Sequence, residues 1–286
     1  MMNYMSHVSK MTGRRLPVVR ALLVLSTLFS LCTVSNASPI KTTVELPLQG
    51  VTFEYKADVR LLQVLDDVNV NANGSIGYFP LSAQLFDKTN TEANESNKAN
   101  QAIEAKKRNV FNQLDAFSVE EPEAKLVKQQ LASFQYLNRV FIELDRNAVI
   151  SQSDKNPLLV SNSHTNKPSD SQIQAFSLYL PQRPTSIQLM GAMKESVTMN
   201  LIEHGTLNDY LDALPNGFMG ESVDNSVAYV VQPDGVVQTI QYAYWNELPV
   251  YLAPGAIVFM AFYSLPSEYS TLNQDIVDLL RHKVGL

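Results

Sequence analysis

Three aromatic side chains with the chemistry to bind a sugar lie together in the segment YAYWNE. They are Tyr242, Tyr244 and Trp245, and the C–H faces of sugar rings can stack on aromatic rings of this kind. If the segment is a strand, Tyr242 and Tyr244 share one face and Trp245 lies on the other, because side chains alternate along a strand. Two interpretations stay open: packing in a core or at a sheet edge, and a platform for a carbohydrate.

Acidic side chains are the second group that could do chemistry. Hydrolysis of a glycosidic bond needs two carboxylates, one of them held protonated by burial. Asp66 and Asp67 end an apolar helical pattern, and Glu120 and Glu121 begin another. Capping and solvation account for acids at helix ends. We therefore expect these carboxylates to be solvated rather than catalytic.

The familiar motifs of enzymes are missing from the sequence. It contains no Gly-x-Ser-x-Gly elbow, no phosphate-binding loop, no His-Glu-x-x-His and no dinucleotide fingerprint. His164, His204 and His282 share no helical or strand spacing, whereas a metal site needs ligands that converge. We expect no enzymatic activity, no catalytic residues, no cofactor and no bound metal.

The first 37 residues are typical of a secretory signal peptide. Lys10, Arg14, Arg15 and Arg20 precede the apolar run ALLVLSTLFSLCTV, and small residues for cleavage follow at Ser35-Asn36-Ala37. The pattern predicts export by the Sec route. No second apolar run reaches the length of a membrane span, so we expect no integral span in the exported chain.

Charge and cysteine content exclude several partners. Residues 1–37 hold four of the 22 basic residues and none of the 28 acidic ones, so the remaining chain has 18 basic residues and a net charge of −10. An acidic chain without a basic cluster is a poor partner for nucleic acid or anionic lipid. The single cysteine, Cys32, lies within residues 1–37, which excludes a disulfide and a thiol nucleophile from the rest.

The first half of the chain predicts a β-hairpin, a helix and then a helical hairpin. TVELPL and VTFEY alternate apolar and polar residues on either side of Gly50, and VRLLQVLDDV repeats apolar residues at helical spacing after a possible cap at Asp58. Two apolar stripes between about residues 98 and 138 predict antiparallel helices, with a capping box from Ser118 to Glu121. VFIEL and AVI are expected to be short strands, and residues 151–172 a loop.

The second half repeats this order of elements. SIQLMGAM predicts a strand ending at Gly191, and Thr206 and Asp209 have the spacing of a capping box before a short helix. VAYVV, the turn QPDG and VVQTIQY predict a hairpin, and Pro254-Gly255 turns the chain into IVFMAFY. The predicted fold class is α+β, with a small mixed sheet wrapped on a helix in each half and the helical hairpin inserted in the first copy.

The tail LNQDIVDLLRHKVGL predicts an amphipathic helix. Leu272, Ile276, Leu279 and Leu280 cluster on one side of a helical wheel. Acids come early and bases late, which suits the helix dipole, and the charge is nearly balanced. Docking on its own domain, docking on a partner and contact with a membrane surface stay open.

Several stretches together resemble the GfcC family of capsule-biosynthesis proteins. They are YFP, RPTSIQLMGAM, GTLNDYLDALP, WNELPVYLAPGAIVFMAF and LNQDIV. The resemblance runs from about Val44 to Lys283. It implies two tandem β-grasp domains: residues 38–182, with the hairpin insert at about 98–138, and residues 183–265, which also resemble the β-grasp repeats of outer-membrane polysaccharide exporters. A C-terminal amphipathic helix, 266–286, follows them.

The resemblance also implies a function and a place. It points to a non-enzymatic periplasmic accessory of capsule or exopolysaccharide assembly or export in a Gram-negative bacterium. The implied partners are envelope proteins of polysaccharide export or assembly, with the polysaccharide itself and a peripheral contact with the outer membrane as further possibilities. The alternative is a periplasmic polysaccharide-binding protein or carbohydrate-active enzyme.

Arg139, in LNRVFIELD, stands where the family carries an arginine at the end of the hairpin. A recognition role stays open beside a structural one at a helix C-terminus or with an acid such as Glu143. This sequence departs from the family at Met193-Lys194-Glu195, where Pro-Gly often follows Gly-Ala, and in a longer Asn-rich loop before Ile103. The candidate interaction residues are Arg139, Tyr242, Tyr244, Trp245, Leu272, Ile276, Leu279 and Leu280.

Overall fold

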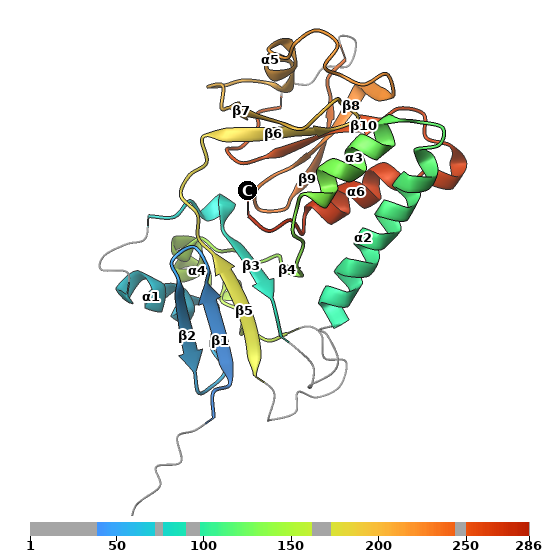
Figure 1. The fold of residues 1–286 in the computed structure, drawn as a ribbon. Helices are drawn as coiled ribbons and strands as arrows, with labels where there is room; N and C mark the ends of the chain where they lie inside the picture. Colours follow the sequence, from blue (N-terminus) through green and yellow to red (C-terminus); the bar gives the residue numbers. More distant parts are fainter. Residues whose placement is uncertain (1–38, 72–76, 90–97, 162–172, 244–249, 286) are drawn as a thin grey trace, which may run out of the picture. The chain divides into compact units, whose positions relative to one another are not determined.

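The computed structural model describes residues 39–71, 77–89, 98–161, 173–243 and 250–285 (Figure 1), and structural statements below refer to these residues. Residues Ser38–Leu286 form one compact unit. The predicted signal peptide, as well as Tyr244 and Trp245, lies outside the described residues. Within them, no helix combines the length and the apolar character needed to cross a membrane.

The first sheet has five strands in the order β2-β1-β5-β3-β4. Their bounds are β1 Thr42–Leu46, β2 Val51–Tyr55, β3 Gln84–Asp87, β4 Arg139–Val140 and β5 Gln174–Tyr179. The predicted hairpin is confirmed as the antiparallel pair β1 and β2, and Gly50 at its turn has a φ of 65° that favours glycine. Strands β1 and β5 are parallel neighbours at the centre.

One hydrophobic core joins this sheet to two helices. Helix α1 spans Leu61–Asn71 and helix α4 spans Arg146–Ser151. Leu61, Val64 and Val149 pack from these helices against the inward-facing residues of β1, β3 and β5. The predicted strand AVI is therefore wrong: Asp145 accepts a hydrogen bond from the Asn147 N–H and caps a short helix there.

The second sheet repeats the first one strand for strand. Its order is β7-β6-β10-β8-β9. Strand β6 pairs antiparallel with β7 on one side and parallel with β10 on the other, just as β1 pairs with β2 and β5 in the first sheet. The bounds are β6 Ser186–Gly191, β7 Val197–Asn200, β8 Val223–Val231, β9 Val237–Gln241 and β10 Ile257–Phe262. Both sheets thus have the strand order of a β-grasp domain.

Helices also pack on the second sheet, in a hydrophobic core separate from that of the first sheet. All six residues of β10 are buried, as expected of a strand covered on both faces. Helix α5, Leu207–Asp212, brings Leu207 and Tyr210 into this core. The predicted capping box is confirmed, since the Asp209 carboxylate accepts from the Thr206 N–H at 2.7 Å. Short 3-10 turns occur at Pro80–Ser82, Ser153–Lys155 and Ser267–Tyr269.

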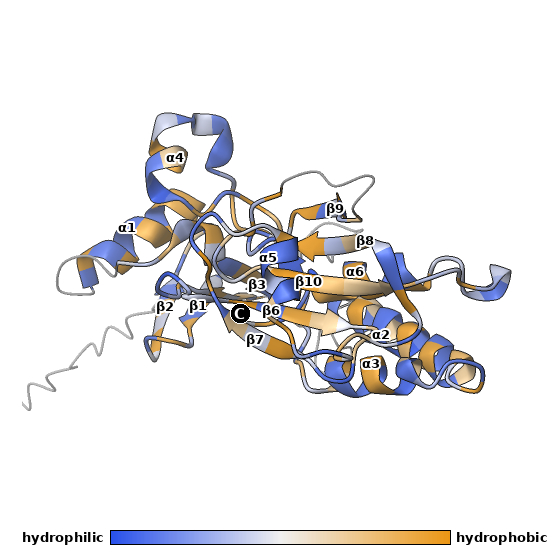
Figure 2. Cartoon of the chain, turned by 90° about the horizontal axis from the view of Figure 1, so that it is seen from above, coloured by the Kyte–Doolittle hydropathy of each residue, from blue (hydrophilic) through white to orange (hydrophobic). Residues whose placement is uncertain are grey.

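The helical hairpin is inserted in the first β-grasp copy along the sequence but packs on the second sheet. Helices α2, Lys98–Phe117, and α3, Glu123–Ala132, contact α6, Leu272–Leu280, and strand β6 (Figure 1). The Phe117 ring meets the Phe262 ring edge-on at 5.3 Å between centroids. Figure 2 shows apolar and polar residues alternating around α2 and α3, as in amphipathic helices.

The start of α3 differs from the sequence prediction. The capping box from Ser118 to Glu121 is wrong, because Pro122 is the residue that precedes the helix. The Ser118 hydroxyl instead donates back to the Asp115 carbonyl at 2.7 Å, at the end of α2. Serine bonds readily to nearby backbone groups, so its side chain ends one helix here rather than beginning the next.

Gln130 fastens the hairpin to the second sheet. Its buried side chain accepts a hydrogen bond from the Gly191 N–H at 2.9 Å and donates to the Gly191 carbonyl at 3.2 Å. Gly191 has a φ of 118°, and a Cβ at this position would lie 2.3 Å from the Met260 carbonyl oxygen. The sequence thus provides a glycine where β6 must approach β10 closely, and a side-chain amide that bonds the buried peptide groups of that glycine.

We predict that Gln130→Ala destabilises the protein by about 1–3 kcal/mol, because buried polar groups of Gly191 lose their partner. Gln129→Ala is the matched control, since Gln129 is the exposed neighbour on the same helix. Urea unfolding of the three proteins checks this. Equal midpoints for the wild type and Gln130→Ala would show that the amide does not hold the hairpin.

Candidate functional site

The tail, the β8–β9 turn and the segment after α3 meet at one place, which we call the junction: residues 135–141, 232–236 and 281–285. The tail runs alongside the segment after α3, with Leu137 N–H donating to the His282 carbonyl at 3.1 Å and Val284 N–H donating to the Gln135 carbonyl at 2.9 Å. Gly285 N–H donates to the Gln84 side chain at 2.9 Å, which ties the tail to strand β3. The junction therefore links elements of both sheets.

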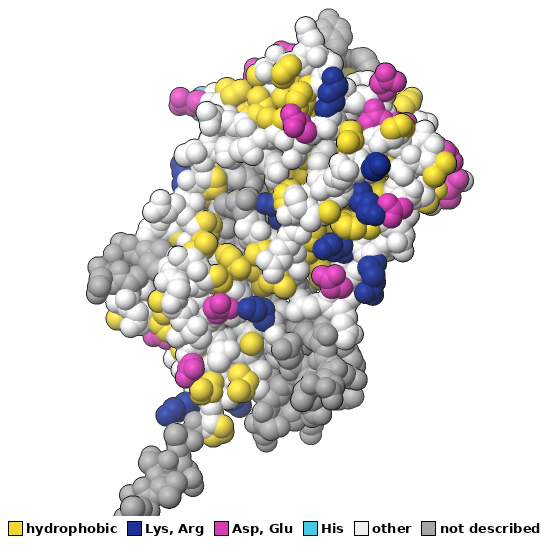
Figure 3. Space-filling view, in the orientation of Figure 1, with side chains coloured by type: hydrophobic (Ala, Val, Ile, Leu, Met, Phe, Trp, Pro, Cys, Tyr) yellow, Lys and Arg dark blue, Asp and Glu magenta, His cyan; other side chains and the backbone are white. Residues whose placement is uncertain are grey.

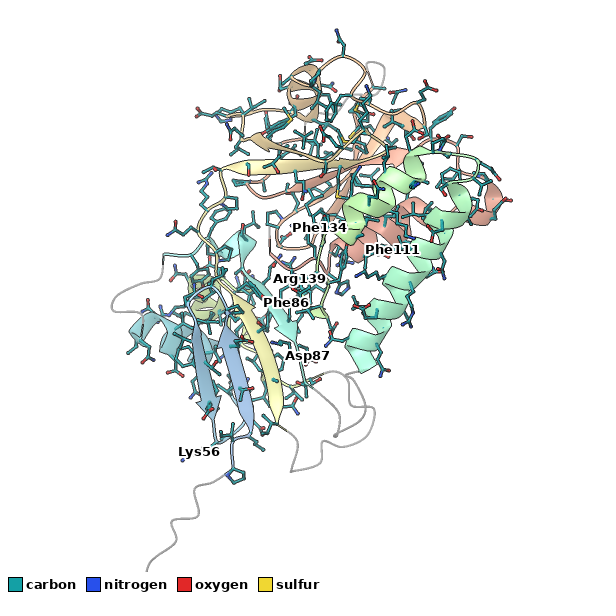
Figure 4. The ribbon with its side chains drawn as sticks, viewed as in Figure 1. Lys56, Phe86, Asp87, Phe111, Phe134 and Arg139 are labelled. Carbon is teal, nitrogen blue, oxygen red and sulfur yellow. The ribbon has the colours of Figure 1, made fainter. Side chains whose placement is uncertain are left out.

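Arg139 lies buried at the centre of the junction, near Phe134 and Phe86 (Figure 4). Its Nη2 donates to the Pro233 carbonyl at 2.6 Å and to the Ala83 carbonyl at 3.4 Å. Burial lowers the pKa of Arg139 to about 10, while the nearby Asp234 charge opposes that shift, so the guanidinium stays charged at neutral pH. Its contacts are with backbone carbonyls of both sheets rather than with Glu143.

Phe141 stands at the rim of the junction. The Arg281 guanidinium lies 4.5 Å from its ring centre and the Arg139 guanidinium 5.6 Å from it, distances at which cations attract aromatic rings. Gly235 in the β8–β9 turn has a φ of 88°, and a Cβ there would be 2.5 Å from the Phe141 ring. The ring therefore needs glycine at this turn.

A groove of about 600 Å³ opens beside Phe141, which we call the Phe141 groove. It is lined by Phe79, Pro80, Leu81, Ala83, residues 139–145, Asp234 and Val236. Phe141 is 42% exposed and Val236 is 51% exposed. The groove thus combines two accessible apolar side chains with the carboxylates of Glu143, Asp145 and Asp234.

A second pocket, of about 340 Å³, is lined in part by Lys283 and Val284 of the tail, and we call it the Lys283 pocket. It is lined by Ser133, Phe134, Gln135, Pro184, Ser186, Ile187, Gln188, Thr198, Gly255, Ile257, Lys283 and Val284. Lys283 is its charged side chain and is only 5% exposed. Burial lowers the pKa of Lys283 to about 8.

The four candidate residues of the tail helix are in the core. Leu272, Ile276 and Leu279 are fully buried and Leu280 nearly so, and they share one cluster with β6, β8 and β10. The side chain of Asn273 also bonds both backbone groups of Phe262, at 3.0 and 2.9 Å. Packing within the protein therefore accounts for this apolar face, and it offers no free surface in the structure.

Tyr242 likewise has a structural place. Its ring is buried and its hydroxyl donates to the Asp224 carbonyl, so it presents no open face on which a sugar could stack. Strand β9 ends at Gln241. Tyr244 and Trp245, the other two aromatic candidates, lie outside the described residues.

Asp66 and Asp67, which were weighed as catalytic acids, have structural partners, whereas Glu120 is exposed to solvent. Asp66 pairs with Arg146 at 2.6 Å, and Asp67 accepts from the Tyr55 hydroxyl at 2.9 Å. Glu143 pairs with Lys155 at 3.2 Å. In the described part of the chain, no group of three or more acids, histidines or cysteines is arranged to hold a metal ion.

Glu121 has an unusual acidity that the sequence did not indicate. A hydrogen bond with Glu123 raises the pKa of Glu121 to about 7 and lowers that of Glu123, with Glu221 adding to the repulsion. The pair stands at the α2–α3 turn and lines neither of the two pockets above. Its geometry is that of two acids sharing a hydrogen bond, not of two acids on opposite sides of a substrate.

Sequence reasoning missed the buried ionisable groups of the tail. His282 was considered only as a metal ligand, yet its Nδ1 accepts from the Arg139 N–H at 3.2 Å. Burial, followed by the charges of Lys106 and Arg281, lowers the pKa of His282 to about 4. Lys283 was not singled out, because a lysine near a chain end is ordinarily exposed. His204 is exposed as expected.

Two β-grasp sheets, an inserted helical hairpin and a C-terminal helix packed on the second sheet define the class of protein. Residues 195–285 match the family model described as "Capsule biosynthesis GfcC C-terminal". This range holds most of the second sheet together with α5 and α6. Residues 195–285 are therefore similar to the C-terminal part of GfcC capsule-biosynthesis proteins.

A curated relative is similar to part of the chain. The "Uncharacterized protein YjbG" of Escherichia coli (strain K12) is 26% identical to this chain over 160 residues. The match covers 55% of this chain and 59% of the relative's length. The printed name gives no activity for that protein.

We predict that Arg139→Ala destabilises the protein by about 1–3 kcal/mol, because the buried Pro233 carbonyl loses its donor and a void remains. Arg146→Ala is the control: it removes a surface pair with Asp66, worth less than about 1 kcal/mol. Denaturant unfolding compares them. Equal decreases in the free energy of unfolding for the two variants would show that the bonds of Arg139 to the Ala83 and Pro233 carbonyls do not stabilise the protein.

We predict that His282 contributes to the stability of the folded protein and that this contribution is lost in acid. The folded state keeps this ring neutral down to a pKa of about 4, whereas the unfolded chain takes up the proton near pH 6.5. Stability from this group is thus complete above about pH 6.5 and lost as the pH falls toward 4.

His282→Asn tests this, because an amide oxygen can still accept from the Arg139 N–H without titrating in this range. Between pH 7 and pH 4 the wild type should lose about 1–3 kcal/mol more than His282→Asn. His204→Asn, at an exposed position, should follow the wild type. If the wild type and His282→Asn lost the same stability between pH 7 and pH 4, the lowered pKa of His282 in the folded state would be contradicted.

Proposed function

We propose that this protein is a non-enzymatic periplasmic accessory of capsule or exopolysaccharide assembly or export, which acts through contacts with other envelope proteins. The match of residues 195–285 to a capsule-biosynthesis family is the observation that carries the proposal. The tandem β-grasp fold and the sequence pattern of an exported chain support it. So do the structural partners of Asp66, Asp67 and Glu143.

The Phe141 groove is the surface that suits a protein contact best. Phe141 and Val236 are large apolar side chains that line the groove and remain accessible. Apolar anchors with a polar rim are typical of recognition surfaces. Asp234, Glu143 and Asp145 supply that rim. Across the face drawn in Figure 3, basic side chains lie among acidic ones, so the apolar groove rather than one sign of charge would direct binding there.

A polysaccharide-binding protein or carbohydrate-active enzyme is the second candidate. The Lys283 pocket favours binding, because hydroxyl and amide side chains line it together with a single cation. Incubation of the purified protein with the polymer separates the candidates. New reducing ends would indicate an enzyme, and saturable binding without cleavage would indicate a polysaccharide-binding protein.

We predict that deletion of the gene lowers surface polysaccharide while its precursors are still made. An accessory of assembly or export acts after precursor synthesis, so the loss should appear at the cell surface. Quantification of surface polymer and of precursor pools in the producing bacterium checks this. Unchanged surface polymer under conditions that induce its production would contradict the proposal.

Complementation with variants tests the protein contact. Val236→Asp places a charge in the Phe141 groove, and Val119→Asp is the control at an 86% exposed valine of the α2–α3 turn. Only Val236→Asp should fail to restore surface polymer and lose its crosslinked envelope partner, with unfolding midpoints equal for both variants. Full restoration by Val236→Asp would exclude the groove as the contact.

A further inference from the structure

We propose that the Lys283 pocket is a binding site for an acidic sugar, a ring that carries a carboxylate. The expected ligand is one unit of an anionic polysaccharide, with its carboxylate on the Lys283 ammonium and its hydroxyls on the polar side chains around it. The choice of a sugar as carrier of the charge rests on the proposed function. The choice of an anion rests on the pocket itself.

The first observation is a buried cation that pairs with no carboxylate of the described residues. The Lys283 ammonium lies 3.5 Å from the Gly285 carbonyl and 4.9 Å from the centre of the Phe134 ring. No carboxylate in the described part of the chain is within ion-pair distance of it. A buried charge is costly unless it is paired, so an anion in the pocket would be stabilised by this ammonium.

The second observation is that a further cation lies behind the first. A cavity of about 10 Å³ is lined by both Arg139 and Lys283. Arg139 bonds backbone carbonyls with its guanidinium, and Asp234 is the acid near it. Lys283 thus remains the charged side chain that lines the pocket, in a chain whose formal net charge is −6.

The third observation is the rest of the lining. Ser186, Gln188 and Thr198 on strands β6 and β7 expose hydroxyl and amide groups, and no side-chain hydrogen bond within the described residues uses them. Gln188 and Thr198 are direct cross-strand partners. Hydroxyls and amides both donate and accept, as ring hydroxyls of a sugar require. Among the described residues that line the pocket there is no aspartate or glutamate.

These features favour a carboxylate over a phosphate. Phosphate sites in proteins generally offer arginine forks or a helix N-terminus with several donors. Here a single ammonium faces the pocket among neutral groups, which suits one negative charge on an otherwise polar ring. A volume of about 340 Å³ is near the lower end of small-molecule pockets, in keeping with a short piece of polymer.

Titration of the full exported chain with glucuronate, glucose and inorganic phosphate, followed by ligand-observed NMR and calorimetry, tests the site. Glucuronate should bind at least about tenfold more tightly than glucose or phosphate. Lys283→Met keeps the length of the side chain and should weaken glucuronate binding at least about tenfold. Lys107→Met is the matched control. Lys107 likewise lies over an aromatic ring, that of Tyr136, but it does not line the pocket.

Gln188→Glu keeps the test decisive if Lys283→Met does not fold. It adds an acid to the half-buried lining and should weaken glucuronate binding while leaving glucose unaffected. Equal binding of glucuronate and glucose, tighter binding of phosphate, or glucuronate binding that neither variant changes would overturn the proposal. These outcomes are independent of the deletion phenotype, so failure of the pocket and failure of the proposed function can be told apart.

Discussion

Burial of the apolar face of α6 is the interaction on which the rest of the structure depends. Leu272, Ile276 and Leu279 have no exposed surface and lie against β8 and β10 of the second sheet, with α2 beside them. The helical hairpin belongs by sequence to the first sheet, yet its apolar residues complete this same core. The second β-grasp copy therefore cannot pack independently of the insert and the tail, whereas the first sheet has a separate core with α1 and α4.

The position of α6 also determines the chemistry of the junction. Once the helix is in place, the residues after it must run past Arg139, where the tail pairs with the segment from Gln135 to Leu137. Backbone carbonyls accept hydrogen bonds from the buried Arg139 and Lys283, and Asp234 is the acid near Arg139. Buried charges held mainly by carbonyls cost free energy in the folded state, and such costs are typical of sites retained for binding.

Much of the fold could be predicted from local patterns. The alternation around Gly50, the helix of LNDYLD with its capping box and the hairpin VAYVV–QPDG–VVQTIQY depend on neighbours in sequence, and all three are confirmed. Strands β3, β5 and β7 escaped prediction. β3 is buried at all four positions, so it shows no alternation, and β5 follows a polar loop. The stripe on α2 and α3 predicted helices but not which sheet they would cover. The burial of Lys283 depends on distant residues and left no local pattern.

Hydrogen exchange of the backbone amides of residues 38–286, followed by mass spectrometry, tests the shared core most directly. Peptides from α6, Leu272–Leu280, should exchange as slowly as those from β10 and α3, because all three would open only with the whole core. Exchange of α6 orders of magnitude faster than β10, with β10 still protected, would contradict the account. It would show a tail helix that leaves the second sheet while the sheet remains folded.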